Sequence, residues 1–233
     1  MTTTISESIC HRLVDDIITG KIPPGQKLEE QTIAERFDVS RTPVRDAFRQ
    51  LVSTGLANSR PHRGVTVANL RVDQIGDMYE GLGELEALCS RYSALRMSVL
   101  ERKRLEKIHE DSRPSKKSKK SKKSKKSKKS KKSKKLEQYS EYNERFHQAI
   151  YEGSHNETLV EMAMTLRRKL APFRRPVFFH GEERIGNSFD EHQTIVDAIL
   201  ASDPETASQA MRSHVANSSM NVISYVEESA RSS

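Results

Sequence analysis

The 233-residue sequence contains no tryptophan, only two cysteines and no long apolar run. Two isolated cysteines, Cys10 and Cys89, are too few for a disulfide framework or a cysteine-based metal site, so we expect both to be reduced and buried. No segment approaches the roughly 18 apolar residues that a membrane helix needs, and no basic stretch is joined to an apolar run near Met1. These absences predict a soluble, cytoplasmic protein without a membrane partner.

A net charge of +8 would ordinarily indicate a nucleic-acid partner. The excess comes from one segment, because residues 115–135 are seven Ser-Lys-Lys repeats that hold 14 lysines. Without those lysines, 26 basic residues stand against 32 acidic ones, which leaves a net charge of −6. A DNA-binding function must therefore be argued from local motifs.

The Ser-Lys-Lys tract has no apolar residue, and its period of three does not match the period of a helix. We expect a solvated, self-repelling and disordered coil over 115–135. Such a segment could tether the protein nonspecifically to DNA or to a membrane surface. Its perfect regularity instead favours a plain linker, or an artificial or placeholder segment.

The first 70 residues show three short helical patterns followed by a hairpin pattern. Apolar residues recur every four positions from Ile5 to Ile17, which predicts an amphipathic helix. Two more helices are expected, and short alternating runs after Gly55 suit a β-hairpin. This order is the layout of a winged helix-turn-helix over residues 1–70, in which the last helix enters the major groove of DNA. The expected bounds are about 5–20, 29–37 and 40–54 for the helices and 56–70 for the hairpin.

Three arginines, Arg41, Arg45 and Arg49, recur at four-residue spacing along the third expected helix. Apolar residues such as Val44 and Phe48 occupy another face of that helix, so the arginines are free to contact an acidic partner. A guanidinium group matches O6 and N7 of guanine and can also clamp a phosphate. Three arginines alone more often form a solvated face, but their place in this layout favours contact with DNA.

Strand patterns give way to long helical ones in the second half of the chain. Helical periodicity and start signals predict five or six helices there. We therefore expect an all-α helical bundle over residues 71–229, interrupted by the lysine tract, and a mostly α fold class for the whole chain. The start signals are Asp73, the pairs Ser98 with Glu101 and Ser154 with Glu157, and Asp203 before Pro204.

A spaced set of residues in the N-terminal part carries a family resemblance. Its main members are Pro24-Gly25, Ile33-Ala34, the run Val39–Ala47 and Gly55-Leu56. Over residues 5–68 this pattern resembles the GntR family of bacterial regulators. The DNA contacts that the resemblance implies are Arg41, Thr42, Arg45 and Arg49 in the third helix, Gln31 before it, and Arg63 and Gly64 at the tip of the wing.

Three segments of the helical half carry a second resemblance. They are 143–147, 191–199 and 211–214, and each contains a histidine. They are similar to the FCD-type domain of the FadR-like branch of the same family, with coverage from about Leu70 to Val226. Asn143 and His147 are four residues apart on one helix, so both can point at one spot. The resemblance implies that Asn143, His147, His192 and His214 hold one divalent metal, and this donor set suits Zn, Ni, Mn or Fe(II).

Two positions depart from the family pattern. Asn143 stands where the family usually has Asp, so the metal affinity should be lower and the metal preference altered. Leu82, ahead of Glu86, stands where the family usually carries an effector-binding arginine. If a carboxylate effector binds, the metal or another cation, such as Arg91 or Arg167, must hold it.

The sequence thus predicts a homodimeric transcription regulator, most simply a repressor, that binds a palindromic DNA operator through two heads. A small organic acid bound in the helical domain would change the spacing of the heads through its differential affinity for two arrangements. Two alternatives are a metal-dependent hydrolase that uses the same histidines and a regulator that senses the metal itself. The hydrolase alternative lacks an HExxH motif and leaves the N-terminal domain unexplained.

Overall fold

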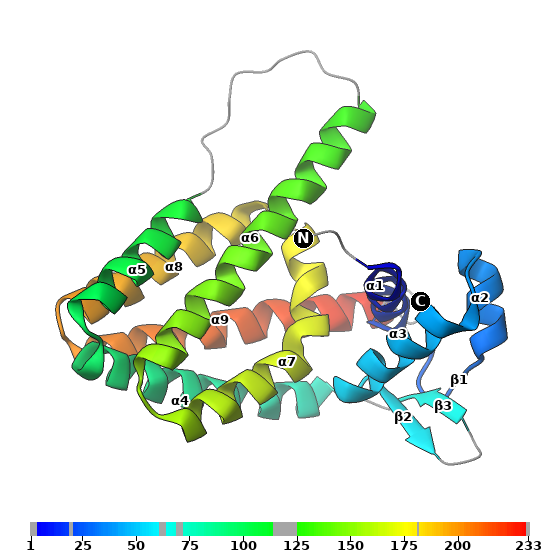
Figure 1. The fold of residues 1–233 in the computed structure, drawn as a ribbon, viewed down its shortest axis with the longest axis horizontal. Coiled ribbons are helices and arrows are strands. Elements are labelled where there is room, and N and C mark those ends of the chain that lie inside the picture. Colours follow the sequence, from blue (N-terminus) through cyan, green and yellow to red (C-terminus); the bar gives the residue numbers. More distant parts are fainter. Residues whose placement is uncertain are drawn as a thin grey trace. The chain divides into compact units, whose positions relative to one another are not determined.

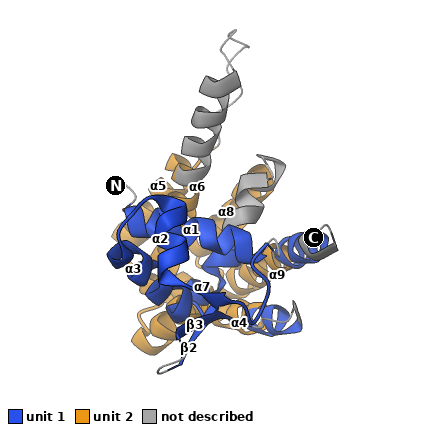
Figure 2. Ribbon diagram, turned by 90° about the vertical axis from the view of Figure 1, so that its right-hand side faces the viewer, with its two compact units in different colours: residues 1–78, 167–176, 220–233 blue, residues 79–166, 177–219 orange. Residues whose placement is uncertain are grey.

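The computed structural model describes residues 4–18, 21–60, 64–68, 72–113, 125–180 and 182–231 (Figure 1). They fall into two compact units (Figure 2). Within the described ranges, no helix is long and apolar enough to cross a membrane. The first unit comprises Met1–Met78, Arg167–Pro176 and Met220–Ser233, and the second comprises Tyr79–Leu166 and Val177–Ser219.

The first unit contains the expected winged helix-turn-helix. Helices α1 and α3 pack against each other and bury their apolar faces, with Leu13 and Leu51 fully inaccessible to solvent. Helix α2 ends at Asp38, whose left-handed backbone (φ 52°) makes the sharp turn that leads to Ser40, the residue before α3. The bounds are α1 Ile5–Ile18, β1 Lys27–Leu28, α2 Glu30–Phe37, α3 Arg41–Ser53, β2 Ala57–Arg60 and β3 Gly64–Val67.

The wing is a three-stranded antiparallel sheet in the order β1-β3-β2. The expected hairpin is confirmed, and its register pairs Ala57 with Val67 and Arg60 with Gly64. Gly64 begins β3 at φ +79°, in the left-handed region that favours glycine. Strand β1 was not expected, because a strand of two residues is too short to show an alternating pattern.

Six helices follow in the described part of the chain, in agreement with the expected bundle. Start signals are confirmed for two of them. Ser98 and Glu101 form a reciprocal capping box before α5, and Asp203 accepts a hydrogen bond from the backbone N–H of Thr206 at 3.1 Å before α9. The bounds are α4 Val72–Arg96, α5 Val99–Asp111, α6 Lys125–Gly153, α7 Glu157–His180, α8 Glu182–Leu200 and α9 Pro204–Arg231.

Helix α6 begins inside the Ser-Lys-Lys tract, at Lys125. The expectation of a coil over the whole of 115–135 is therefore wrong for 125–135, while 115–124 lies outside the described residues. Lysine is a good helix former, and extending an existing helix avoids the cost of a new nucleus. Continuity with the amphipathic helix that follows thus outweighs the missing periodicity.

The start of α7 also differs from the expected capping box of Ser154 with Glu157. Asn156 occupies the N-cap position, and its Oδ1 accepts a hydrogen bond from the backbone N–H of Leu159 at 3.2 Å. Ser154 is instead fully buried. Asparagine is as good an N-cap as serine, so the nearer residue takes the role.

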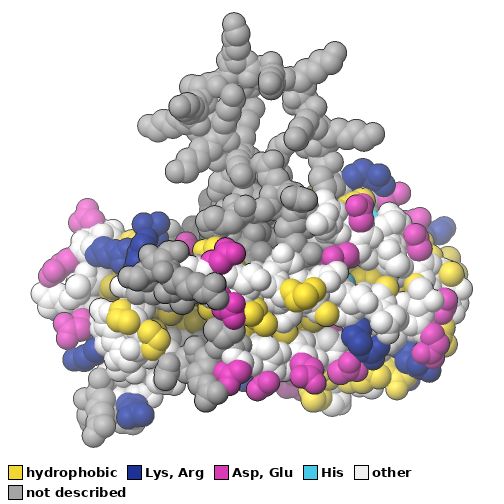
Figure 3. All heavy atoms as spheres, turned by 180° about the vertical axis from the view of Figure 1, so that it is seen from behind, with side chains coloured by type: hydrophobic (Ala, Val, Ile, Leu, Met, Phe, Trp, Pro, Cys, Tyr) yellow, Lys and Arg dark blue, Asp and Glu magenta, His cyan; other side chains and the backbone are white. Residues whose placement is uncertain are grey.

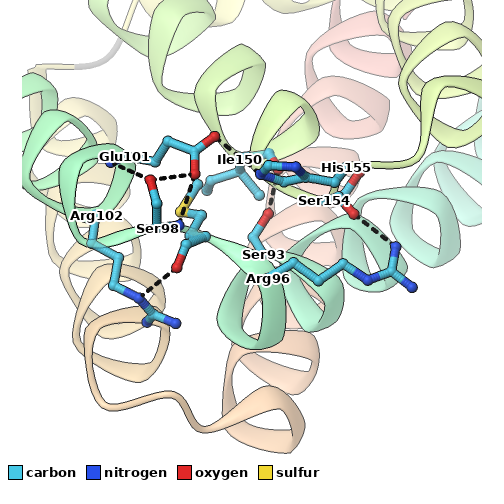
Figure 4. A network of polar contacts seen from close by, with 9 residues as sticks. Ser93, Arg96, Ser98, Glu101, Arg102, Ile150, Ser154 and His155 are labelled. Atoms are coloured by element: carbon cyan, nitrogen blue, oxygen red, sulfur yellow. Dashed lines mark hydrogen bonds and ion pairs between the residues drawn. The ribbon is translucent and has the colours of Figure 1, made fainter.

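The corner between α4 and α5 is tied to the end of α6 by polar contacts (Figure 4). Ser93 donates to the carbonyl of Ile150 at 2.5 Å, and Arg96 donates to the carbonyl of Ser154 at 2.9 Å. Both carbonyls lie in or just after the last turn of α6, and that of Ile150 also accepts a hydrogen bond from the backbone N–H of Ser154 at 3.2 Å. The corner therefore fixes the end of the helix that carries His147.

Both cysteines are free and buried, as expected. Burial, reinforced by the nearby Glu86 carboxylate, raises the pKa of Cys89 to about 12. A thiol with so high a pKa is a packing residue and not a nucleophile.

Candidate metal and DNA-binding sites

Three of the four predicted metal ligands form a buried histidine cluster. His147, His192 and His214 come from α6, α8 and α9, and one ring nitrogen of each lies within 4.8 Å of the others. The Nε2 atoms of His192 and His214 are 3.3 Å apart. The structure thus brings together residues from three helices that are far apart in the sequence.

A carboxylate orients the ring of His214. Nδ1 of His214 lies 2.6 Å from Oε2 of Glu191, whose other oxygen accepts a hydrogen bond from Asn217 at 2.9 Å. An ionised carboxylate only accepts hydrogen bonds, so Nδ1 carries the proton and Nε2 presents its lone pair to the cluster. Carboxylate partners of this kind fix the tautomer of metal-binding histidines.

A second carboxylate, that of Glu86 on α4, lies beside His147. Its Oε2 is 2.9 Å from Nδ1 of His147, and its Oε1 accepts a hydrogen bond from the hydroxyl of Tyr151. Glu86 and His147 are completely buried. Sequence reasoning did not assign a role to Glu86 or Tyr151, because the contact joins different helices and leaves no spacing signal.

Asn143, the fourth predicted ligand, lies one turn before His147 and is 6% exposed. Its Oδ1 is buried without a hydrogen-bond partner among the described residues. A buried oxygen without a partner is costly, and coordination of a cation would satisfy it. The donor set of three imidazoles and one amide oxygen therefore fits a divalent metal.

Aromatic rings pack around the histidines. Phe146 stacks on the ring of His192 with 4.1 Å between centroids and an angle of 18°. It also meets the ring of His147 edge-on at 5.4 Å. These contacts restrict how far the two imidazoles can rotate, which preorganises the cluster.

The two arginines predicted to hold an effector have different surroundings. Arg91 lies 2.5 Å from the carboxylate of Glu205, and both side chains are substantially exposed. Arg167 is buried, at 4% exposure, and belongs to the first compact unit, whereas the histidine cluster belongs to the second. Their role in effector binding stays a prediction.

The predicted DNA-binding side chains of α2 and α3 are exposed. Arg45 pairs with Glu30 at 2.8 Å, Arg49 pairs with Asp46 at 2.9 Å, and Arg41 donates to Gln31 at 2.9 Å. Exposed pairs of this kind are weak, so a phosphate or a guanine can replace the acidic partner. Thr42 is the second residue of α3, Gly64 begins β3, and Arg63 lies outside the described residues.

On the face shown in Figure 3, the described residues do not have one dominant sign of charge. In the view of Figure 3, basic and acidic side chains are interspersed with hydrophobic ones. This agrees with the charge balance of the sequence without its lysine tract. Recognition of DNA by local groups such as the α3 arginines stays a prediction.

A winged helix-turn-helix followed by a helical bundle with a buried histidine cluster defines a DNA-binding transcription regulator with a second, helical domain. Residues 5–67 match the family described as "Bacterial regulatory proteins, gntR family", and residues 77–217 match the FCD domain. The chain belongs to the GntR family of transcription regulators, in the group that carries a C-terminal FCD domain.

Two curated relatives agree with this assignment. The chain is 26% identical over 214 residues to the "Probable D-xylose utilization operon transcriptional repressor" of Paenarthrobacter nicotinovorans, covering 92% of this chain and 87% of the relative. It is 26% identical over 209 residues to the HTH-type transcriptional repressor GlaR of Escherichia coli (strain K12), covering 87% and 89%. These relatives are regulators and not enzymes, so the hydrolase alternative finds no support.

Solved structures show the same fold. The structure of E. coli McbR/YncC aligns with a TM-score of 0.59 and 20% identity, covering 97% of this chain and 99% of that one. The structure of Lar, which controls the expression of the Listeria monocytogenes agr system, aligns with a TM-score of 0.63 and 16% identity, covering 95% and 98%. Identities this low support the fold alone.

Proposed function

We propose that this regulator binds a palindromic operator as a homodimer and that a small organic acid, held beside a divalent metal, modulates its affinity for DNA. The observation that carries the proposal is the buried cluster of His147, His192 and His214. Imidazole groups that converge from three helices are a donor set that divalent metals bind in proteins.

Asn143 and the three histidines would hold the metal, and Glu86 and Glu191 would balance its charge from outside the coordination sphere. The bound ion would offer open coordination positions to the carboxylate of an effector. The metal would therefore take the role of the effector-binding arginine that the family usually carries at the position of Leu82. Leu82 is buried at 1% exposure and contributes no charge to the site.

The α3 arginines would read the operator, one α3 helix for each half-site. An effector shifts DNA affinity only if it binds the two arrangements of the heads with different affinities. The names of two relatives mention repression, which supports repression as the simplest mode here.

The test begins with purified protein, its metal content by mass spectrometry and its oligomeric state by light scattering. Selection from random DNA then gives the operator, and titrations with organic acids follow, with and without the metal. We expect a dimer, one ion per chain, a palindromic site and acid-dependent affinity. A monomeric protein that selects no sequence contradicts the proposal.

The same titrations separate a second candidate, in which the ion itself is the signal. The neutral Asn143 favours this candidate, because a weaker site would fill and empty over physiological metal concentrations. A metal sensor would change its operator affinity on metal addition alone and would not respond to acids.

A further inference from the structure

A fourth buried histidine, His109 on α5, lies beside the metal cluster. It is 2% exposed, and its ring stacks on Phe189 of α8 with 4.2 Å between centroids and an angle of 18°. The same ring meets His192 edge-on at 6.4 Å and Phe146 at 6.1 Å. His109 therefore belongs to the wall of the candidate site and is not one of the three clustered ligands.

The hydrogen bonds around His109 determine its tautomer. Gln193 donates its amide N–H to Oδ1 of Asp197 at 2.8 Å, which turns its oxygen toward Nε2 of His109 at 3.0 Å. Nε2 must therefore carry a proton. A neutral ring that carries its proton on Nε2 presents Nδ1 as a hydrogen-bond acceptor.

Nδ1 of His109 has no hydrogen-bond partner among the described residues, and among the other buried polar atoms without one are two that lie four residues before a clustered histidine. They are Oδ1 of Asn143, four residues before His147, and Oγ of Ser188, four residues before His192. Buried polar atoms are almost always satisfied in native proteins. Unsatisfied atoms on α5, α6 and α8, each close to a clustered histidine in sequence or in space, indicate a polar ligand.

We infer that Nδ1 of His109 accepts a hydrogen bond from a hydroxyl group of the effector, so that the site selects hydroxy acids over otherwise identical acids without the hydroxyl. This inference rests on the proposed acid-binding function. A hydroxyl suits this atom because it can donate to an unprotonated ring nitrogen.

The expected selectivity is substantial because the acceptor is buried. An acid without the hydroxyl would leave Nδ1 unsatisfied, and penalties of this size correspond to roughly 5- to 150-fold in affinity. A site built to bind a hydroxyl rejects the analogue that lacks it far better than an apolar pocket rejects an added hydroxyl.

Two substitutions separate the nitrogen atoms of the ring. In His109→Asn the side-chain oxygen can occupy the place of Nδ1 and remain an acceptor. In His109→Gln the amide nitrogen can replace Nε2 and keep the hydrogen bond to Gln193, while the acceptor is removed. We expect the Asn variant to retain preference for hydroxy acids and the Gln variant to lose it.

The experiment uses the full-length, metal-loaded protein and calorimetric titration with matched acids: malate against succinate, lactate against propionate, and 3-hydroxybutyrate against butyrate. Metal content and melting temperature are measured for each variant. Long-range 1H–15N spectra of the wild-type protein report the tautomer of His109, and this measurement does not depend on whether the variants fold. We expect an Nε2-protonated ring whose Nδ1 signal shifts when a hydroxy acid binds.

The outcomes distinguish the role of His109 from the acid-binding function. Equal affinity for both members of every pair overturns the role of His109 but leaves the proposed metal-dependent acid binding intact. An Nδ1-protonated tautomer likewise overturns it. Failure of all acids to bind the metal-loaded protein overturns the acid-binding function, and the inference with it. Preference for hydroxy acids that survives in His109→Gln assigns selectivity to another group and contradicts the inference.

Discussion

The Nε2 atoms of His192 and His214 lie 3.3 Å apart, although the two rings come from different helices. Because Nδ1 of His214 donates a hydrogen bond to Glu191, the Nε2 of that ring faces its neighbour with a lone pair. Two ring nitrogens at this distance are stabilised by a proton or a cation between them. His147 completes the cluster, so a cation is the simplest partner for all three.

The metal prediction compares two histidine variants. His192→Ala should empty the site, whereas His155→Ala, which removes an exposed histidine paired with Glu101, should leave it filled. Asn143→Asp should tighten metal binding by adding a charged oxygen ligand. Occupancy should fall on acidification, because imidazole must be neutral to coordinate. Metal analysis and chelator competition measure all three variants, and full occupancy in His192→Ala would refute the assignment.

The DNA prediction concerns Arg45, which the structure places exposed on α3 beside Glu30. Arg45→Ala should weaken binding to the selected operator by about 1 to 3 kcal/mol, the usual value of one bidentate pairing with a base. Arg12→Ala removes the same charge from the exposed surface of α1 and serves as the matched control. Fluorescence anisotropy with specific and random DNA gives both affinities. Unchanged specific binding in Arg45→Ala means that α3 is not the reading helix.

How much the sequence could predict differs between the elements. The order of the first three helices, the hairpin and the Ser98–Glu101 capping box were all predictable, because each depends on residues close in the sequence. Strand β1 and the cap at Asn156 were not, since tertiary pairing and competition between neighbouring caps decided them. Local sequence patterns therefore failed for a strand that forms only by pairing with β3 and for a helix start at which two residues can serve as the N-cap.

The candidate site shows the same division. The three histidines could be assigned through family resemblance, and the structure brings them together. Glu86 and His109 could not be assigned, because their partners lie on other helices at separations that follow no period. The groups that orient ligands are therefore the ones that only three-dimensional packing reveals.

A stability prediction follows from the buried carboxylate of Asp16 on α1. Its side chain is 3% exposed and lies 2.6 Å from the guanidinium of Arg36 on α2. Asp16→Asn should lower the free energy of unfolding by about 1.5 to 3 kcal/mol, the usual value of a hydrogen bond to a charged group. Asp46→Asn breaks the exposed pair with Arg49 and should cost less than about 1 kcal/mol. Urea denaturation of both variants tests the contrast, and equal destabilisation of the two would contradict it.

The capping box of α5 predicts a dependence of stability on pH. Hydrogen bonds from Ser98, with a smaller contribution from His155, hold the pKa of Glu101 below its usual value. A lowered pKa in the folded state means that the stabilisation is present above the ordinary glutamate pKa and is lost as the pH falls through the lowered value. Ser98→Ala should cost about 1 kcal/mol at neutral pH. The difference between the wild-type protein and Ser98→Ala should shrink in urea titrations at progressively acidic pH, and a constant difference would argue against this account.

The Ser-Lys-Lys tract permits a prediction that separates charge from recognition. Because α6 begins at Lys125, replacing the tract with a short loop would remove part of a helix, whereas changing its lysines to glutamine preserves helix propensity. The loss of fourteen positive charges should lower the affinity for random DNA and make it less dependent on salt. The slope of log K against log salt concentration should become shallower by about 0.9 for each phosphate that is no longer neutralised. The preference for the operator over random DNA should persist, because lysines that contact phosphates do not read bases. Salt titrations with both DNAs measure each quantity. If the glutamine variant lost its operator preference, the tract would be part of the recognition surface and the assignment to α3 alone would be incomplete.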